Sequence, residues 1–206
     1  MDILKLEDFG AAVTRAAGAL RRGGVIIFPT DTLYGLGADA FSDEAVDKVY
    51  AIKGRDEGKP THCIVSDLAM AAEYAEVNDA AKKLAEKFLP GALTLILKKK
   101  VGVEGGIARR MDTVGIRIPN NEFCIELARA FGKPFTATSA NTAGMNVEAS
   151  VEKIIAQLGG GAGVDLAIDA GPSPLAQPST VVNVVSGHPS ILREGAIPAS
   201  QILELF

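Results

Sequence analysis

The sequence contains few of the side chains that metal and redox chemistry require. It has two cysteines, two histidines and no tryptophan. The histidines, His62 and His188, and the cysteines, Cys63 and Cys124, lack the spacing of a zinc site, and we expect the thiols to be free and buried. The sequence therefore argues against a structural zinc site and against a Ser-His-Asp triad.

Long apolar runs and phosphate-binding motifs are absent as well. The longest apolar stretches resemble residues 25–28 (V-I-I-F), far short of the roughly 20 residues of a membrane span. The acidic N-terminal segment lacks a signal-peptide pattern, so we expect a cytoplasmic protein with no membrane association. No G-x-x-x-x-G-K-[ST] motif occurs, which excludes a P-loop.

What the sequence does contain is typical of a folded domain. Apolar residues make up 48% and charged residues 22% of the 206 residues, and no stretch resembles a linker, so we expect a single domain over residues 1–206. Helical periodicity predicts helices over residues 8–22 and 43–53, and the apolar run at 25–28 predicts a buried strand. Residues 35–40 (G-L-G-A-D-A) are interpreted as a turn.

Helices and strands alternate along the whole chain. Apolar segments of strand length occur between amphipathic segments, including a strand at 114–118, a helix at 122–131 and a strand at 134–138. This order predicts an α/β fold with a twisted sheet of mixed parallel and antiparallel strands and flanking helices. The irregular segment 171–178 is a candidate lid or binding loop.

Two pairs of polar residues stand where secondary structure ends. Lys53 and Arg55 follow a predicted helix, where cations are common for electrostatic reasons alone, but both can reach one polyphosphate from a flexible turn. Ser139 and Asn141 follow a predicted strand, as in an ordinary turn or in a ligand site at the carboxyl end of a strand.

Further candidates lie in apolar surroundings. The segment 29–37 is polar although core segments flank it, and it includes Thr30. Arg117 alternates with isoleucines on a predicted strand, so it faces either solvent or a pocket. Ser179 precedes one predicted strand and Arg193 ends another.

Together these segments resemble the YrdC-type threonylcarbamoyl-AMP synthases over nearly the whole chain and in the same order. The matching strings are P-T-D-T-L-Y-G-L-G (29–37), K-G-R (53–55), V-G-I-R-I-P (114–119), T-S-A-N (138–141), P-S-T-V-V (178–182) and L-R-E-G (192–195). The resemblance is to the short, single-domain form of that family. It implies a twisted mixed sheet around a large basic cavity, the YrdC-like fold.

The resemblance also implies an enzyme. Such a nucleotidyltransferase converts L-threonine, bicarbonate and ATP to threonylcarbamoyl-AMP (L-threonylcarbamoyladenylate) and pyrophosphate. The product serves N6-threonylcarbamoyladenosine modification of tRNA, so a downstream threonylcarbamoyl transferase is an expected partner. We expect no metal site in the protein, because the triphosphate and water can supply most ligands of Mg²⁺.

The roles implied by the resemblance divide the candidates into two groups. Lys53 and Arg55 are expected to bind the ATP phosphates and to be the catalytic residues. Ser139, Asn141 and Arg193 are expected to complete the nucleotide site. Thr30, Arg117 and Ser179 are expected to hold threonine, with Arg117 making a bidentate contact to its carboxylate.

One departure and one alternative accompany this interpretation. Gln177-Pro178 precedes Ser179 where many relatives have Glu before the serine, so the geometry of that loop stays open. The alternative is a non-catalytic module that binds double-stranded RNA or tRNA through basic residues such as Arg109 and Arg110. The net charge of −4 and the few aromatic residues weigh against it.

Overall fold

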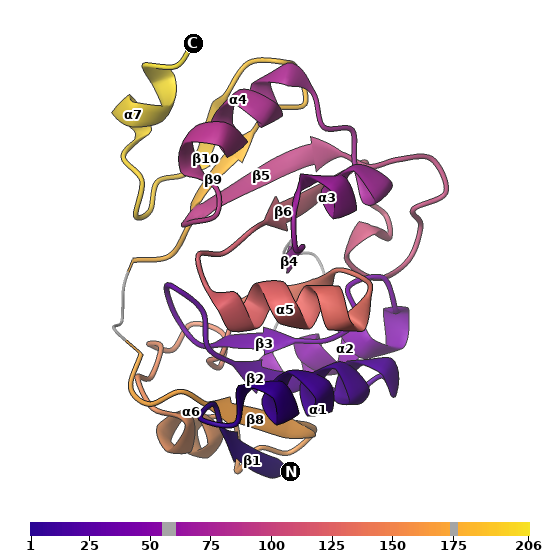
Figure 1. Ribbon diagram of the computed structural model, residues 1–206, viewed down its shortest axis with the longest axis vertical. Helices are drawn as coiled ribbons and strands as arrows, with labels where there is room; N and C mark the ends of the chain where they lie inside the picture. Colours follow the sequence, from indigo (N-terminus) through magenta and orange to yellow (C-terminus); the bar gives the residue numbers. More distant parts are fainter. Residues whose placement is uncertain (55–60, 174–176) are drawn as a thin grey trace.

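The computed structural model describes residues 1–54, 61–173 and 177–206. In these residues ten strands form one sheet, which helices cover on both faces (Figure 1). The strands are β1 (Asp2–Lys5), β2 (Ile26–Phe28), β3 (Gly35–Gly37), β4 (His62–Ile64), β5 (Leu93–Lys98), β6 (Thr113–Arg117), β7 (Phe135–Ser139), β8 (Leu166–Asp169), β9 (Thr180–Asn183) and β10 (Ser190–Arg193). The helices are α1 (Phe9–Arg21), α2 (Asp43–Lys53), α3 (Leu68–Tyr74), α4 (Asp79–Phe88), α5 (Glu122–Phe131), α6 (Val151–Gln157), α7 (Ala199–Leu203) and the 3₁₀ turn η1 (Gly106–Ala108).

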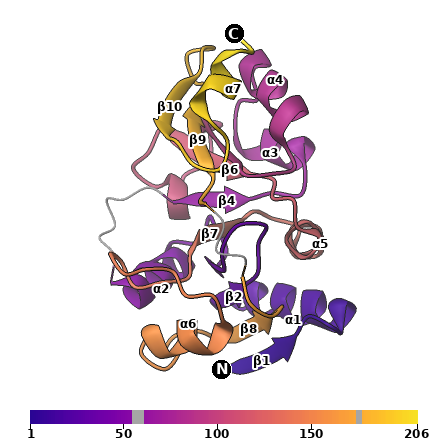
Figure 2. The same ribbon diagram turned by 90° about the vertical axis from the view of Figure 1, so that its left-hand side faces the viewer.

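The sheet combines parallel and antiparallel pairs in the order β1-β8-β2-β3-β7-β4-β6-β5-β9-β10. The pairs β1–β8, β8–β2, β4–β6 and β5–β9 are parallel, and the others are antiparallel. This confirms the predicted mixed α/β sheet. Strand β7 lies between β3 and β4 and so connects the part of the sheet near the N-terminus with the part near the C-terminus (Figure 2).

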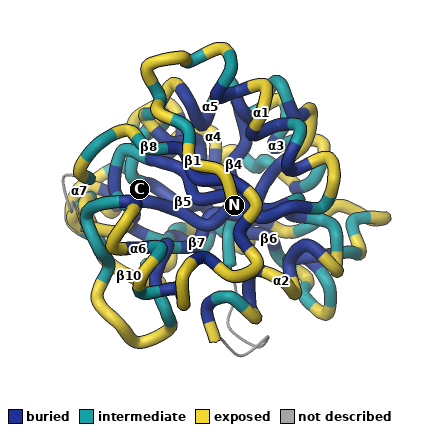
Figure 3. The backbone as a smooth tube through the Cα atoms, turned by 90° about the horizontal axis from the view of Figure 1, so that it is seen from below, coloured by how far each residue is buried: buried dark blue, intermediate teal, exposed yellow. Residues whose placement is uncertain are grey.

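The position of strand β2 between two cores explains why its sequence is apolar without interruption. Ile26 and Phe28 belong to a core with α1 and α5, whereas Val25 and Ile27 belong to a core with α2 and α6. A third core packs β5, β6 and β9 against α3, α4 and α7. Buried backbone accordingly runs through the centre of the molecule in Figure 3. None of the helices in the described ranges is long and apolar enough to cross a membrane.

The first two predicted helices begin after side chains that cap them, those of Asp8 and Ser42. The Asp8 carboxylate accepts a hydrogen bond from the Ala11 backbone N–H at 3.2 Å, and the Ser42 hydroxyl accepts one from the Ala45 N–H at 3.3 Å. Each bond satisfies a backbone donor that the first turn leaves without an intrahelical acceptor. Helix α2 ends at Lys53, as predicted. This end places the Lys53 side chain at the site described below.

The prediction of a turn at residues 35–40 is wrong for the first half of that segment. Gly35–Gly37 forms β3, which pairs antiparallel with both β2 and β7. A Cβ at Gly35 would lie 2.7 Å from Cζ of Phe28, and one at Gly37 would lie 2.9 Å from its Cε1. The two glycines make room for the Phe28 ring across the strand, so here they mark close packing and not a reversal of the chain.

Candidate active site

A cavity of about 360 Å³ lies beside β7, where the two parts of the sheet meet. Its wall comes from the connection between β2 and β3, the start of β4, the ends of β6, β7 and β10, and the approach to β9. The lining residues are Thr30, Thr32, Leu33, Tyr34, Gly35, Thr61, His62, Arg117, Ala137, Thr138, Ser139, Val147, Pro178, Ser179 and Arg193. Many of them lie at strand ends, the usual place for ligands in α/β sheets.

The cavity brings together five of the predicted site residues, although they span positions 30 to 193. All three residues predicted to hold threonine line it, as do two of those predicted to bind the nucleotide. These are Thr30, Arg117, Ser139, Ser179 and Arg193. They come from different elements, namely the connection between β2 and β3, the ends of β6, β7 and β10, and the approach to β9.

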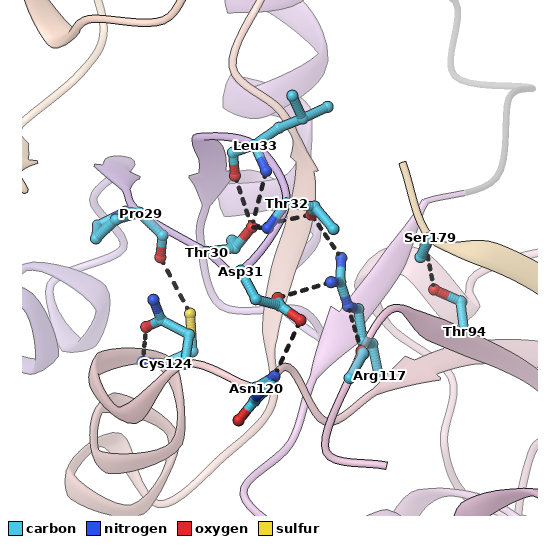
Figure 4. A network of polar contacts seen from close by, with 12 residues as sticks. Pro29, Thr30, Asp31, Thr32, Leu33, Thr94, Arg117, Asn120, Cys124 and Ser179 are labelled. Atoms are coloured by element: carbon cyan, nitrogen blue, oxygen red, sulfur yellow. Dashed lines mark hydrogen bonds and ion pairs between the residues drawn. The ribbon is translucent and has the colours of Figure 1, made fainter. Parts of the chain in front are cut away.

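Arg117 is one of the residues that line the cavity, and its guanidinium group donates hydrogen bonds to three neighbours (Figure 4). Its Nη2 donates to Oδ1 of Asp31 at 2.7 Å and its Nη1 to Oγ1 of Thr32 at 3.1 Å. Its Nε donates to the backbone oxygen of Gly91 at 3.1 Å. Only 5% of the Arg117 side chain and 14% of the Asp31 side chain are exposed. The sequence left open whether Arg117 faces solvent or a pocket, and the structure places it in the pocket.

The Thr30 hydroxyl is engaged in the turn that carries it. Its Oγ1 accepts hydrogen bonds from the backbone N–H groups of Thr32 and Leu33 at 3.0 and 3.1 Å, and it lies 2.7 Å from the oxygen of Leu33, to which it donates. Such hydroxyl-to-backbone bonds fix a tight turn. Thr30 thereby shapes the cavity, and its predicted contact with threonine stays a prediction.

Ser179 and Arg193 form another part of the cavity wall. The Ser179 hydroxyl is 2.8 Å from the hydroxyl of Thr94, and both side chains are buried. Nη2 of Arg193 donates to the backbone oxygen of Ser179 at 2.8 Å. Partial burial, and secondarily the charge of Arg117, lower the pKa of Arg193 from its usual value. Arg193 thus brings positive charge to the cavity, whereas Asp31 offsets the charge of Arg117.

Lys53 lies behind the cavity and not in its wall. It is 2% exposed, and its ammonium group contacts the backbone oxygen of Ser139 and, at 2.8 and 3.0 Å, the backbone and side-chain oxygens of Asn141. The Ser139 hydroxyl donates to the same Asn141 side-chain oxygen at 2.6 Å. Lys53 and Asn141 therefore fix the turn that presents Ser139. Arg55, their predicted companion, lies outside the described residues, as do residues 174–176 of the candidate lid.

Three residues of the site carried no role in the sequence-based prediction. Asp31 supplies the carboxylate for Arg117, and Thr32 supplies a hydroxyl. The Tyr34 hydroxyl donates to the oxygen of Gly171 at 2.7 Å and accepts from the N–H of Ala170 at 2.9 Å, which fastens the segment after β8 to the cavity. An arginine on a buried strand requires a nearby anion, so the sequence indicates that Arg117 has such a partner but not which residue it is.

A resident metal ion does not fit these side chains. Among the residues that the structure describes, no three histidine, cysteine or acidic side chains gather closely enough to hold one. Both oxygens of Asp31 already accept hydrogen bonds, one from Arg117 and one from the N–H of Asn120 at 3.1 Å. Any cation in the cavity would have to bring most of its own ligands.

Comparison with known proteins agrees with this geometry. The family model for Sua5, YciO and YrdC, described as "Telomere recombination", matches residues 18–195, which include every residue that lines the cavity. The chain belongs to this family. The resemblance noted in the sequence is thereby confirmed.

Individual relatives extend the match. A protein of Methanocaldococcus jannaschii is 41% identical over 87% of this chain and 84% of its own length. The threonylcarbamoyl-AMP synthase of Bacillus subtilis is 36% identical over 92% of this chain. The crystal structure of Pyrococcus abyssi Sua5 complexed with L-threonine superimposes with a TM-score of 0.89 at 31% identity and covers the whole chain. This chain spans 55% of the Bacillus protein and 61% of the Pyrococcus chain.

Proposed function

We propose that this protein is a threonylcarbamoyl-AMP synthase, a nucleotidyltransferase that uses L-threonine, bicarbonate and ATP. The observation that carries the proposal is the cavity in which Arg117, Ser179 and Arg193 meet. Guanidinium groups bind carboxylates and phosphates, and the substrates bring one of each kind of anion. Family membership and the names of the relatives support the same assignment.

The reaction needs no side chain as nucleophile. The amine of threonine forms an N–C bond to carbon dioxide derived from bicarbonate and loses a proton, which gives a carbamate. A carbamate oxygen then attacks the α-phosphorus of ATP, and the bond between the α-phosphorus and the bridging oxygen breaks to release pyrophosphate. The protein's task is to align the two anions and to stabilise the charge that develops on the phosphoryl oxygens.

In this proposal the described residues share this task as the resemblance implies, except that Lys53 and Asn141 act indirectly. Arg117 would bind the threonine carboxylate through two N–H groups, and the hydroxyls of Thr30 and Ser179 would lie beside the amino acid. Arg193 and Ser139 would face the nucleotide, with Arg55 at its phosphates. Lys53 and Asn141 would act on the nucleotide through the turn that they fix, since the Lys53 ammonium already contacts three oxygens of the chain. Mg²⁺ would enter as part of the ATP complex.

The proposal extends to the domain organisation, the location and the partners of the protein. The protein would act as one domain in the cytoplasm. Its product would pass to a threonylcarbamoyl transferase that modifies tRNA. Binding of tRNA or double-stranded RNA by the protein itself is a weaker candidate, because Arg109, one of the cations that would serve it, is already paired with Asp43 and Asp47.

The test is pyrophosphate release with each substrate omitted in turn. We expect release only when threonine, bicarbonate and ATP are all present, with serine a poorer substrate. Lys53→Ala and Arg55→Ala should each lower turnover at least about tenfold, which corresponds to about 1.4 kcal/mol of transition-state stabilisation. Arg117→Lys should raise KM for threonine more than KM for ATP, because lysine cannot make the bidentate contact.

Arg129→Lys is the matched control. Arg129 is exposed and pairs with Glu126 on the surface of α5, so this variant should keep both KM values. Pyrophosphate release that does not depend on threonine would reject the proposal. Salt-sensitive RNA binding without turnover would favour the RNA-binding alternative.

A further inference from the structure

Asp31 lies beside Arg117 (Figure 4) and is not among the residues that line the cavity. One of its carboxylate oxygens accepts from Nη2 of Arg117 at 2.7 Å, and the other accepts from the backbone N–H of Asn120 at 3.1 Å (Figure 4). Both oxygens are therefore engaged within the chain. Because Asn120 lies three residues beyond Arg117, the carboxylate connects the arginine with the backbone that follows its strand.

The hydrogen bonds of Arg117 leave a defined pair of donors. A guanidinium group has five N–H donors, one on Nε and two on each terminal nitrogen. Within the described part of the chain, Nε donates to Gly91, one N–H of Nη1 to Thr32 and one N–H of Nη2 to Asp31. One N–H remains on each terminal nitrogen, and a carboxylate can accept from both terminal nitrogens of a guanidinium.

We propose that Asp31 is a positioning residue that holds the Arg117 guanidinium for the α-carboxylate of the amino-acid substrate. The inference rests on the proposed function. Asp31 has two opposing effects on such a substrate. Its negative charge weakens the attraction between Arg117 and a carboxylate, whereas its hydrogen bond fixes the orientation of the fork. Because bidentate binding depends on orientation, the positioning effect is the larger one.

The sign of the effect of Asp31→Asn distinguishes the two contributions. If charge alone mattered, neutralising Asp31 would tighten the binding of threonine. Asparagine replaces one of the two carboxylate oxygens by an NH2 group, so either Arg117 or the Asn120 N–H then faces a donor in place of an acceptor, and the orientation of the guanidinium is weakened. The proposal therefore expects threonine to bind about tenfold more weakly, the loss of one charge-assisted hydrogen bond.

Calorimetric titration with threonine measures this affinity, and KM for ATP in the pyrophosphate assay gives the comparison. Asp39→Asn is the matched control, because Asp39 is equally buried (15% exposed), accepts from the N–H of Phe41 at 3.0 Å and pairs with Lys133 at 3.4 Å. We expect Asp31→Asn to change KM for ATP less than twofold and Asp39→Asn to change neither quantity. Threoninol, in which a hydroxymethyl group replaces the carboxylate, should bind wild type and Asp31→Asn equally.

Several results would overturn the proposal. Unchanged or tighter threonine binding by Asp31→Asn would do so, as would an equal loss for ATP or for threoninol, since these mean a general structural role. If Asp31→Asn does not fold, Asp31→Glu gives the same comparison, because the longer side chain keeps the charge but displaces the carboxylate, and unchanged affinity there would also reject it. A wild-type protein that binds no threonine would instead reject the proposed function, and this inference with it.

Discussion

Replacing Lys53 by methionine separates two roles that one ammonium group can have. The substitution keeps an unbranched side chain in the buried space but removes every N–H donor. In the described part of the chain, its acceptors include the backbone oxygens of Ser139 and Asn141 and the side-chain oxygen of Asn141. If Lys53 works through the turn that presents Ser139, the variant loses stability as well as activity.

The cost follows from what each acceptor retains. The Ser139 oxygen still accepts from the Asn141 N–H at 2.9 Å, and the Asn141 side-chain oxygen still accepts from the Ser139 hydroxyl at 2.6 Å. The Asn141 backbone oxygen keeps no other donor among the described residues. The orphaned carbonyl costs about 2 kcal/mol and the two weakened acceptors together about 2 kcal/mol. Because these oxygens solvate the buried ammonium group, relief of its burial offsets only part of this cost, and we expect a net loss of about 3 kcal/mol.

Urea denaturation followed by circular dichroism measures this difference, and a chain of this length should melt roughly 6–12 °C lower. Turnover should fall at least about tenfold when assayed well below the new melting temperature. Lys48→Met is the control on the same helix. The Lys48 ammonium makes one exposed bond, to the oxygen of Gly23 at 2.7 Å, so its loss should change stability by less than about 0.5 kcal/mol.

The result that would refute this reasoning is specific. If Lys53→Met lost activity but kept the wild-type free energy of unfolding, the contacts with Ser139 and Asn141 would be energetically unimportant. The ammonium group would then act on the substrate directly, as a phosphate ligand.

The remaining predictions concern Tyr34, Asp67 and the two cysteines. Tyr34→Phe should lower the free energy of unfolding by about 2 kcal/mol in urea titrations, because Gly171 loses its donor and the Ala170 N–H its acceptor; an unchanged value would contradict this. Hydrogen bonds, chiefly from the Met70 N–H, lower the pKa of Asp67, so its contribution to stability is present above about pH 4 and is lost as pH falls through the folded-state pKa. Asp67→Asn keeps the cap, and its stability should therefore fall less between about pH 5 and 2 in acid titrations. Burial raises the pKa of Cys63 to about 12, so with Cys124 also buried, neither thiol should react with a thiol reagent at neutral pH until the protein unfolds.

The elements of the fold could be predicted where the signal is local. Helix α2 begins at its cap and ends at Lys53 as its periodicity indicated, and β2 is buried on both faces as its apolar run indicated. Strand β3 could not be predicted in this way. Its glycines are typical of a turn. They belong to a strand because β3 pairs with β2, and in that pairing the Phe28 ring occupies the space that side chains at these positions would need.

The candidate site shows the same division. The resemblance to a family indicated which residues to group, and five of them line one cavity. The sequence could not indicate the partner of Arg117, because Asp31 is 86 residues away and reaches it only through the order of strands in the sheet. Nor could it indicate the burial of Lys53, since a cation at a helix end is ordinarily solvated and this one is covered by the turn after β7.

The two arginines of the cavity differ in a way that bears on how it binds two anions. The charge of Arg117 is compensated by Asp31, so what this residue offers a ligand is chiefly a fixed direction of hydrogen bonding. Arg193 has no carboxylate partner within the described ranges, and its neighbours are the backbone oxygen and hydroxyl of Ser179. Burial and the charge of Arg117 both lower its pKa, so its cationic form is less favourable in the folded protein than in water. An anion bound beside Arg193 would relieve both effects, and for this reason we propose that the multiply charged phosphates bind on the Arg193 side and the single carboxylate on the Arg117 side.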